Sequence, residues 1–404
     1  MPLRLTFCSL IALSAACPAL AAPVFNRIAS FATVENMAAN EDRTRPTSAE
    51  IMTATPDGMW LIYSDSPLGG IGLIDITDPK APKPLGNIAM DGEPTTAVVL
   101  GRTAFVGVNT SESYVKPSGV LRSVDLDGRK VLASCDLGGQ PDSVALSPRG
   151  DMIAIAIENE RDEDLNDGAL PQMPAGFVVR LPLKDGQVDC AGKQVIALTG
   201  LAEVAGDDPE PEYVDFNTQG DLVVSLQENN HLVVIGADGK VESHFSAGSV
   251  DLDGVDVNKD GKLDFTSSLK SVPREPDTVA WLDNDHFATA NEGDWKGGSR
   301  GFTIWNRDGT VVYDSGPEFE HALIRIGHYP EHRSGKKGVE PEALKYAEFD
   351  GEKLLFVGSE RGNAIGVYDV ADPTQPKLRQ ILPSGIAPEG LVAIPSRNLL
   401  ASAN

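Results

Sequence analysis

Short apolar runs separated by polar turns recur along most of the chain as one repeated unit. A typical unit opens with a proline, an acidic residue and an apolar run, and three more β-rich runs follow, separated by Gly, Asp and Pro. The first copy lacks the proline before Glu50, and the second has Thr95 in place of the acid. The clearest unit has its runs at Pro341–Tyr346, Lys353–Gly358, Ala364–Val370 and Lys377–Leu382. Four antiparallel strands in a repeat of about 45 residues predict a blade of a β-propeller.

The opening phrase occurs seven times, which predicts an all-β, seven-bladed propeller. Six predicted blades are complete: Glu50–Met90, Pro94–Leu137, Pro141–Leu198, Pro211–Gly248, Pro276–Gly316 and Pro341–Leu382. The seventh starts at Pro388, and the sequence ends at Asn404 within its second strand, so we expect a protein that continues further. The stretch Phe25–Thr33 is interpreted as a lone strand that could supply the outer strand of this blade and close the ring.

Four longer intervals between predicted strands are interpreted as insertions: Glu160–Pro174, Thr199–Pro209, Asp251–Arg274 and Pro317–Gly338. Strand frameworks are interchangeable between propellers, so we expect function in these loops and in the channel mouth.

Net charge and an N-terminal targeting signal restrict the partners and the cellular location that we expect. The chain of 404 residues is 41% hydrophobic and carries a formal charge of −25, which argues against nucleic acid as a partner and suits divalent cations. Residues 1–21 are interpreted as a secretory signal, cleaved after Ala21, with a lipoprotein site at Cys17 as the alternative. Residues 22–404 then form the propeller domain. No later segment predicts a membrane span, so we expect a periplasmic or secreted protein.

The predicted mature chain keeps two cysteines, Cys135 and Cys190. One even pair in an oxidising compartment predicts a disulfide, and two free buried thiols are the alternative.

The acidic residue of the opening phrase occupies the same place in six units. The first strand of each blade lines the central channel, so we expect a ring of carboxylates from Glu50, Asp142, Glu212, Asp277, Glu342 and Glu389, with Thr95 in the second blade. Like charges raise one another's pKa, and a divalent cation relieves this by taking oxygen ligands. The alternative is that each acid only ends a turn or binds nearby backbone N–H groups.

A second polar set follows the predicted second strands, including Glu158-Asn159-Glu160, Glu228-Asn229, Asn291-Glu292 and Glu360-Arg361. Antiparallel strands place these ends on the same face as the Pro-acid starts. Arg333 and Lys337 precede the sixth opening phrase and could recognise phosphate or carboxylate oxygens. Together with Glu342 they are our candidate catalytic residues; salt bridges to the acid ring are the alternative.

The sharpest local motif lies in the third insertion. Counted from Asp256, oxygen ligands fall at positions one, three, five and nine of a calcium-type loop: Asp256, Asn258, Asp260 and Asp264, with Gly261 at position six. Ser267 stands where the loop pattern has a bidentate Glu. The alternative is an acidic turn without an ion. His-Glu-x-x-His and P-loop motifs are absent from the sequence.

Several longer phrases resemble one known family. They include Asp207-Asp208-Pro209-Glu210-Pro211-Glu212-Tyr213-Val214, Ala290-Asn291-Glu292-Gly293-Asp294, Lys337-Gly338-Val339-Glu340-Pro341-Glu342 and Phe356-Val357-Gly358-Ser359-Glu360-Arg361. In these residues the chain resembles the choice-of-anchor I propellers, extracytoplasmic bacterial proteins of which some are described as alkaline phosphatases. It most resembles the N-terminal part of longer proteins described as having an esterase-like activity of phytase. The family's Arg-Ser-Phe-Ser-Ile is Arg300-Gly301-Phe302-Thr303-Ile304 here.

Three functions remain open at this level. The first is the propeller part of a secreted, calcium- or other metal-dependent phosphoesterase that acts on a small anionic phosphoester. The second is a non-catalytic scaffold, stabilised by calcium, that binds a ligand or a further C-terminal domain of the same protein. The third is hydrolysis of a lactone in the channel, with the same use of the metal.

Overall fold

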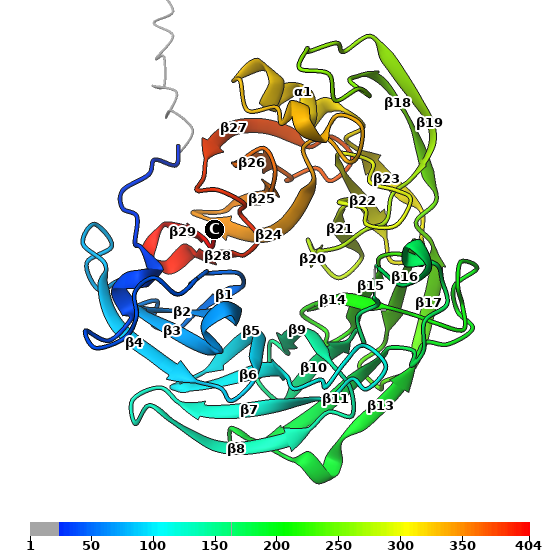
Figure 1. Cartoon of the computed structure of the whole chain (residues 1–404). Coiled ribbons are helices and arrows are strands. Elements are labelled where there is room, and N and C mark those ends of the chain that lie inside the picture. Colours follow the sequence, from blue (N-terminus) through cyan, green and yellow to red (C-terminus); the bar gives the residue numbers. More distant parts are fainter. Residues whose placement is uncertain (1–23, 163) are drawn as a thin grey trace, which may run out of the picture.

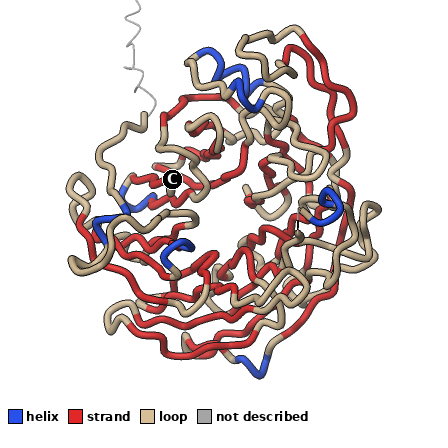
Figure 2. Tube along the Cα trace, viewed as in Figure 1, coloured by secondary structure: helices blue, strands red, loops and turns tan. Residues whose placement is uncertain are grey.

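A computed structural model describes residues 24–162 and 164–404; the predicted signal at residues 1–21 lies outside them. The strands form sheets arranged in a ring around a central channel, with helical turns confined to the rim and loops (Figures 1 and 2). Each sheet runs outward from the channel in chain order. No helix in the described ranges has the length and hydropathy needed to cross a membrane.

Six sheets are blades with a ladder of four strands. The first three have these strands: β1 Met52–Ala54, β2 Trp60–Asp65, β3 Gly70–Asp75 and β4 Lys83–Ala89; β5 Glu93–Leu100, β6 Thr103–Asn109, β7 Gly119–Asp125 and β8 Lys130–Asp136; β9 Pro141–Leu146, β10 Met152–Ile157, β11 Phe177–Lys184 and β13 Gln194–Ala197, with β12 Gln187–Val188 beside β11.

The remaining sheets complete the ring. Their strands are β14 Pro211–Phe216, β15 Leu222–Leu226, β16 His231–Ile235 and β17 Val241–Ser246; β20 Val279–Trp281, β21 His286–Ala290, β22 Phe302–Asn306 and β23 Val311–Asp314; β24 Pro341–Phe349, β25 Glu352–Ser359, β26 Ala364–Asp369 and β27 Lys377–Pro383; and the two-stranded sheet β28 Leu391–Ile394 with β29 Leu399–Ser402. The prediction of four-stranded antiparallel blades is therefore confirmed for six blades, whereas a complete seventh blade is not observed in the described chain.

The apolar core lies between neighbouring blades. Fully buried Ile62 and Leu73 of the first blade, for example, share one cluster with Val106 and Val108 of the second. Each sheet has a neighbouring blade on either side, so both of its faces are buried. This explains why the middle strands are almost continuously apolar.

The prediction of an N-terminal strand at Phe25–Thr33 is wrong. No strand is assigned there, and the backbone N–H and carbonyl of Phe25 bind the side chain of Gln380 rather than a strand ladder. The apolar character of the segment is used for packing instead: the Phe25 ring makes edge contacts with Phe349 and Phe356 of the sixth blade. The segment thus lies beside the region where the ring closes without pairing as a strand.

Two insertions carry secondary structure of their own. The third folds into a hairpin, β18 Ser249–Val255 with β19 Ser267–Pro273, and the fourth contains the helix α1 Glu318–Arg325. Short 3-10 turns occupy Thr33–Asn36, Ser66–Leu68, Leu165–Gly168, Cys190–Gly192, Glu331–Arg333 and Pro395–Arg397.

A disulfide joins Cys135 and Cys190, the pair expected from the sequence, with their Cα atoms 5.5 Å apart. It ties the outer strand of the second blade to the outer part of the third. A disulfide is consistent with an extracytoplasmic location, because such compartments are oxidising.

The first strands of several blades are bulged at their channel ends. The register with the second strand shifts between Pro94 and Thr96, between Pro211 and Val214, and between Pro341 and Leu344, and the third blade has the same irregularity. A bulge inserts an unpaired residue and re-aims neighbouring side chains. The bulges fall on the residues of the Pro-acid phrase, so they decide what faces the channel.

Candidate channel site

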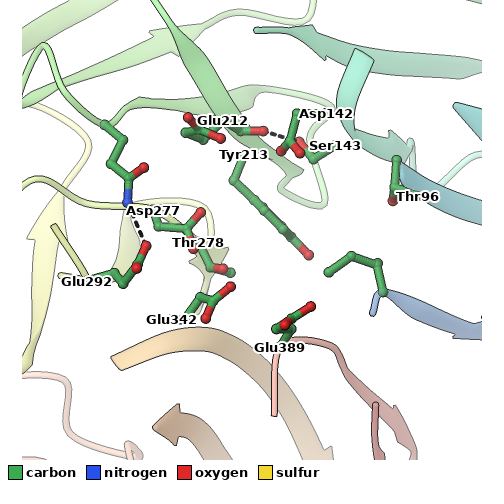
Figure 3. Close-up of a pocket in the computed structure, with 12 residues that line it drawn as sticks. Thr96, Asp142, Ser143, Glu212, Tyr213, Asp277, Thr278, Glu292, Glu342 and Glu389 are labelled. Atoms are coloured by element: carbon green, nitrogen blue, oxygen red, sulfur yellow. Dashed lines mark hydrogen bonds between the residues drawn. The ribbon is translucent and has the colours of Figure 1, made fainter. Parts of the chain in front are cut away.

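Carboxylates from several blades meet at one mouth of the channel. They surround a cavity of about 170 Å³ whose acidic lining consists of Asp142, Glu212, Asp277, Glu292, Glu342 and Glu389 (Figure 3). The structure therefore brings together five of the six acids expected from the opening phrase and adds one from the end of a second strand.

One group of three carboxylates stands out because no described side chain forms an ion pair or hydrogen bond with it. Oxygen atoms of Asp142, Glu158 and Glu212 lie within 4.8 Å of one another. Within the described ranges, none of the three side chains makes a hydrogen bond or an ion pair. Three acceptor-only groups this close are unfavourable when all are ionised, unless a cation or protons join them. We call Asp142, Glu158 and Glu212 the open triad.

The pKa values of the open triad show that ionising all three carboxylates is unfavourable. Burial, followed by the charge of Glu160, raises the pKa of Asp142 to about 7. Burial first, and then neighbouring carboxylates, raise the pKa values of Glu158 and Glu212 well above their usual range. A divalent cation would favour the ionised forms, because it supplies the missing opposite charge.

A second group, Glu292, Glu342 and Glu360, also has oxygen atoms within 4.8 Å of one another, but the protein supplies cations to it. Lys337 Nζ lies 3.2 Å from Glu292 Oε1, and Arg361 Nη1 lies 2.9 Å from Glu360 Oε1. We call Glu292, Glu342 and Glu360 the paired triad. One oxygen of Glu342 stays buried without a hydrogen-bond partner, so the neutralisation is incomplete.

The other predicted ring members lie around these triads. Burial, followed by the charges of Glu292 and Asp142, raises the pKa of Asp277 well above the usual range. Burial and the charge of Glu50 raise the pKa of Glu389 to about 7. Glu50 itself accepts a short hydrogen bond from Ser66 and is not among the residues that line the cavity.

The two basic residues predicted to be catalytic, Lys337 and Arg333, have different partners in the structure. Lys337 reaches the acids at the mouth through Glu292 and lies 3.5 Å from Asp294. Arg333 instead forms a short ion pair with Glu340, a fully buried carboxylate that Arg361 also contacts at 3.1 Å. Arg333 therefore pairs with a buried carboxylate outside the predicted acid ring.

Backbone N–H groups of the calcium-type loop are bound by one acid of the loop and by one acid of the fourth insertion. Asp256 is 1% exposed and accepts N–H groups of Asn258 and Asp264 at 3.1 and 3.2 Å. Glu331 accepts the N–H groups of Asp260 and Gly261. Among the described residues, the acids of this loop do not form a group of three within 4.8 Å, so calcium binding there stays a prediction.

Three members of the triads were not named as metal ligands from the sequence: Glu158, Glu292 and Glu360. A signal existed, because all three belong to the polar ends of second strands that were expected on the same face. The repeat pattern could not predict the distances between these carboxylates, since strand ends on one face of the ring need not converge.

Comparisons with known proteins give a family and a fold. The family description of the choice-of-anchor I domain matches residues 52–297 and 296–373. No curated protein matches the sequence.

Solved propellers are similar in shape across most of the chain. Hydrazine synthase of Kuenenia stuttgartiensis gives a TM-score of 0.54 at 14% identity over 88% of this chain and 95% of that one. Virginiamycin B lyase of Staphylococcus aureus gives 0.51 at 11% identity over 86% and 88%. A Bacteroides uniformis protein described as a 6-phosphogluconolactonase gives 0.52 at 11% identity over 83% and 86%. At these identities the likeness establishes the propeller fold alone.

Proposed function

The chain belongs to the choice-of-anchor I family, and we propose that its channel mouth binds a divalent cation, calcium in the first instance, and hydrolyses a small phosphoric ester. The observation that carries the proposal is the open triad: three half-buried carboxylates with oxygens within 4.8 Å and no hydrogen bond or ion pair to any described residue. Oxygen-only ligands of this kind suit hard cations. A bound cation would polarise the ester and activate a water molecule.

The residues of this chain have separate tasks in the proposal. Asp142, Glu158 and Glu212 hold the cation, while Asp277 and Glu389 extend the acidic rim and restrict which groups can enter. Lys337 lies beside Glu292, which lines the cavity, so we assign it the task of meeting an anionic ester. Glu342, with one buried unpartnered oxygen, is the candidate acceptor for a proton of the attacking water.

Lactone hydrolysis is the second candidate, and one observation favours it. Arg333 and Arg361 are both engaged by Glu340, which leaves Lys337 as the basic side chain at the acid-lined cavity in the described structure. A neutral cyclic ester needs less positive charge than a phosphate. The proposal further includes a periplasmic or secreted location.

The experiment separates these functions in two steps. Calcium is titrated calorimetrically into chelator-treated protein, and the loaded protein is then assayed with a phosphomonoester, phytate and a lactone. We expect one calcium site that the substitution Glu158→Gln weakens strongly, while Glu112→Gln, at an exposed residue, leaves it unchanged. Calcium binding without turnover of any ester would support the scaffold, and the absence of binding by calcium, magnesium, manganese or zinc would refute the metal site.

A further inference from the structure

The residue that follows the acid of each opening phrase shows a pattern of its own. Four consecutive repeats carry a hydroxyl there, Thr96, Ser143, Tyr213 and Thr278, whereas the other three carry Ile51, Ala343 and Gly390. Hydroxyl groups therefore occupy one side of the channel directly beside the carboxylates.

The bulges explain how two successive residues can both face the channel. In a regular strand, neighbouring side chains point to opposite faces. In the third and fourth blades the register shifts at this point and releases both the acid and the hydroxyl residue from the ladder. In the second blade the shift releases Thr95, and Thr96 pairs with Gly107. All four hydroxyl residues line the acid cavity, and Figure 3 shows them among the carboxylates.

Three of these hydroxyls are free. Ser143 Oγ donates to the carbonyl of Glu212 at 2.7 Å and accepts the N–H of Val214 at 3.0 Å. Thr96 and Thr278 are each only 4% exposed, yet neither hydroxyl has a hydrogen-bond partner among the described residues. Both residues line the cavity, so their hydroxyls are available to hydrogen-bond a ligand there.

Tyr213 is the third free hydroxyl, and its position is central. Its side chain extends across the cavity toward Glu389 in Figure 3, and its hydroxyl has no partner in the described chain. The residue also lines a second cavity of about 350 Å³ further along the channel, so its ring lies at the boundary between the two. A tyrosine hydroxyl is protonated at neutral pH and can donate a hydrogen bond.

We propose that Thr96, Tyr213 and Thr278 together bind the oxygen atoms of an oxyanion head group, a phosphate or phosphoric monoester, that is held at the same time by the cation of the open triad. The carboxylates only accept hydrogen bonds and repel an anion, so the oxyanion needs donors that carry no negative charge. The hydroxyls supply them from the second, fourth and fifth blades. This inference rests on the proposed cation site and specifies the ligand of that site.

The size of the cavity limits what enters. About 170 Å³ is below the range of roughly 300–1,000 Å³ typical for pockets that enclose drug-sized ligands. A head group therefore fits, while the organic remainder of an ester stays at the mouth, where Lys337 lies.

The test titrates inorganic phosphate into the calcium-loaded protein, with calcium affinity measured separately for every variant. We expect Tyr213→Phe to weaken phosphate binding by about tenfold or more, since a hydrogen bond to a charged group is lost, and Thr96→Val and Thr278→Val to act in the same direction. Calcium affinity should remain within about twofold, because hydroxyls are not the cation's main ligands. Thr53→Val is the matched control: Thr53 lines the second cavity and not the acid cavity, so this substitution should leave phosphate binding unchanged.

Two results would overturn the inference while leaving the cation site in place. One is calcium binding with a phosphate affinity that none of the three variants changes. The other is equally tight binding of a neutral polyol, such as glycerol, which would show that the hydroxyls and carboxylates recognise sugar-like groups instead. A wild-type protein that binds no divalent cation would refute the proposed function, and this inference with it.

Discussion

The open triad and the paired triad are two solutions to one problem, the convergence of three carboxylates at a channel mouth. Both combine acids from a first-strand bulge and a second-strand end, and both bring oxygens within 4.8 Å. They differ in what lies beside them: Lys337 and Arg361 reach the paired triad, while the open triad has no ion pair in the described structure. Lys337 comes from the fourth insertion and Arg361 from the β25–β26 turn, so an insertion and a blade turn together provide the cations of the paired triad.

The largest predicted effect concerns the blades beside the open triad. Replacing Cys135 and Cys190 by Ala opens a cross-link spanning 55 residues and should lower the free energy of unfolding by about 4 kcal/mol. Denaturant unfolding with and without reductant measures it. Calcium affinity should not change in the folded variant, because no ligand of the open triad is touched. A parallel loss of affinity would show that rigidity of these blades, and not the unpaired carboxylates, distinguishes the two triads.

Removal of a ligand tests the comparison directly. Asp142→Asn should weaken calcium binding by at least about 100-fold, since even outer-shell substitutions at metal sites cost 10–100-fold. Glu292→Gln, in the paired triad, should change the same affinity much less, because Lys337 already neutralises that carboxylate. Calorimetry measures the calcium affinity of both variants. Equal losses of affinity would mean that the two triads share one ion.

Lys337→Met should make the paired triad more like the open triad, because it removes one of the cations that neutralise the paired triad. It leaves Glu292 and Asp294 without their cation, and we expect a loss of about 2 kcal/mol in unfolding free energy, less than the 3–5 kcal/mol of a fully buried pair because Lys337 is partly exposed. Calcium should restore stability and bind with a higher stoichiometry than in the wild type. Lys337→Arg, which keeps the charge, is the control. An unchanged stoichiometry in Lys337→Met would contradict this account of the difference.

The smallest predicted effect is a pH dependence of the calcium-free protein. The pKa values of Asp142 and Glu389 are raised to about 7, and that of Glu360 to about 6, so the folded state holds protons that the unfolded state has released. Stability is therefore present at low pH and is lost as the pH rises from about 4.5 toward 7, with a slope of about 1 kcal/mol per pH unit for one retained proton. Saturating calcium should remove most of this slope, because it stabilises the ionised forms. Equilibrium unfolding over this pH range, with calcium and with chelator, provides the measurement.

Much of the fold could be predicted from local patterns. Alternating apolar runs and turn residues specify strands within a few residues of each other, so blade boundaries such as Pro341–Leu382 agree with the observed β24–β27. The segment Phe25–Thr33 shows where this reasoning fails. Its apolar side chains were compatible with a strand, but whether its backbone pairs depends on which groups lie beside it, and Gln380 takes the place of a strand partner.

The sequence by itself determined that the acids of the opening phrase share one ring, because equal positions in repeated blades are related by the rotation of the propeller. It did not determine which carboxylates meet within ligand distance or which are neutralised. Those outcomes depend on bulges that release Glu212 and Tyr213 together, and on the paths of insertions that bring Lys337 to Glu292 but Arg333 to Glu340. Such contacts join residues far apart in the chain, and their energies follow from distance and burial, which only the tertiary structure decided.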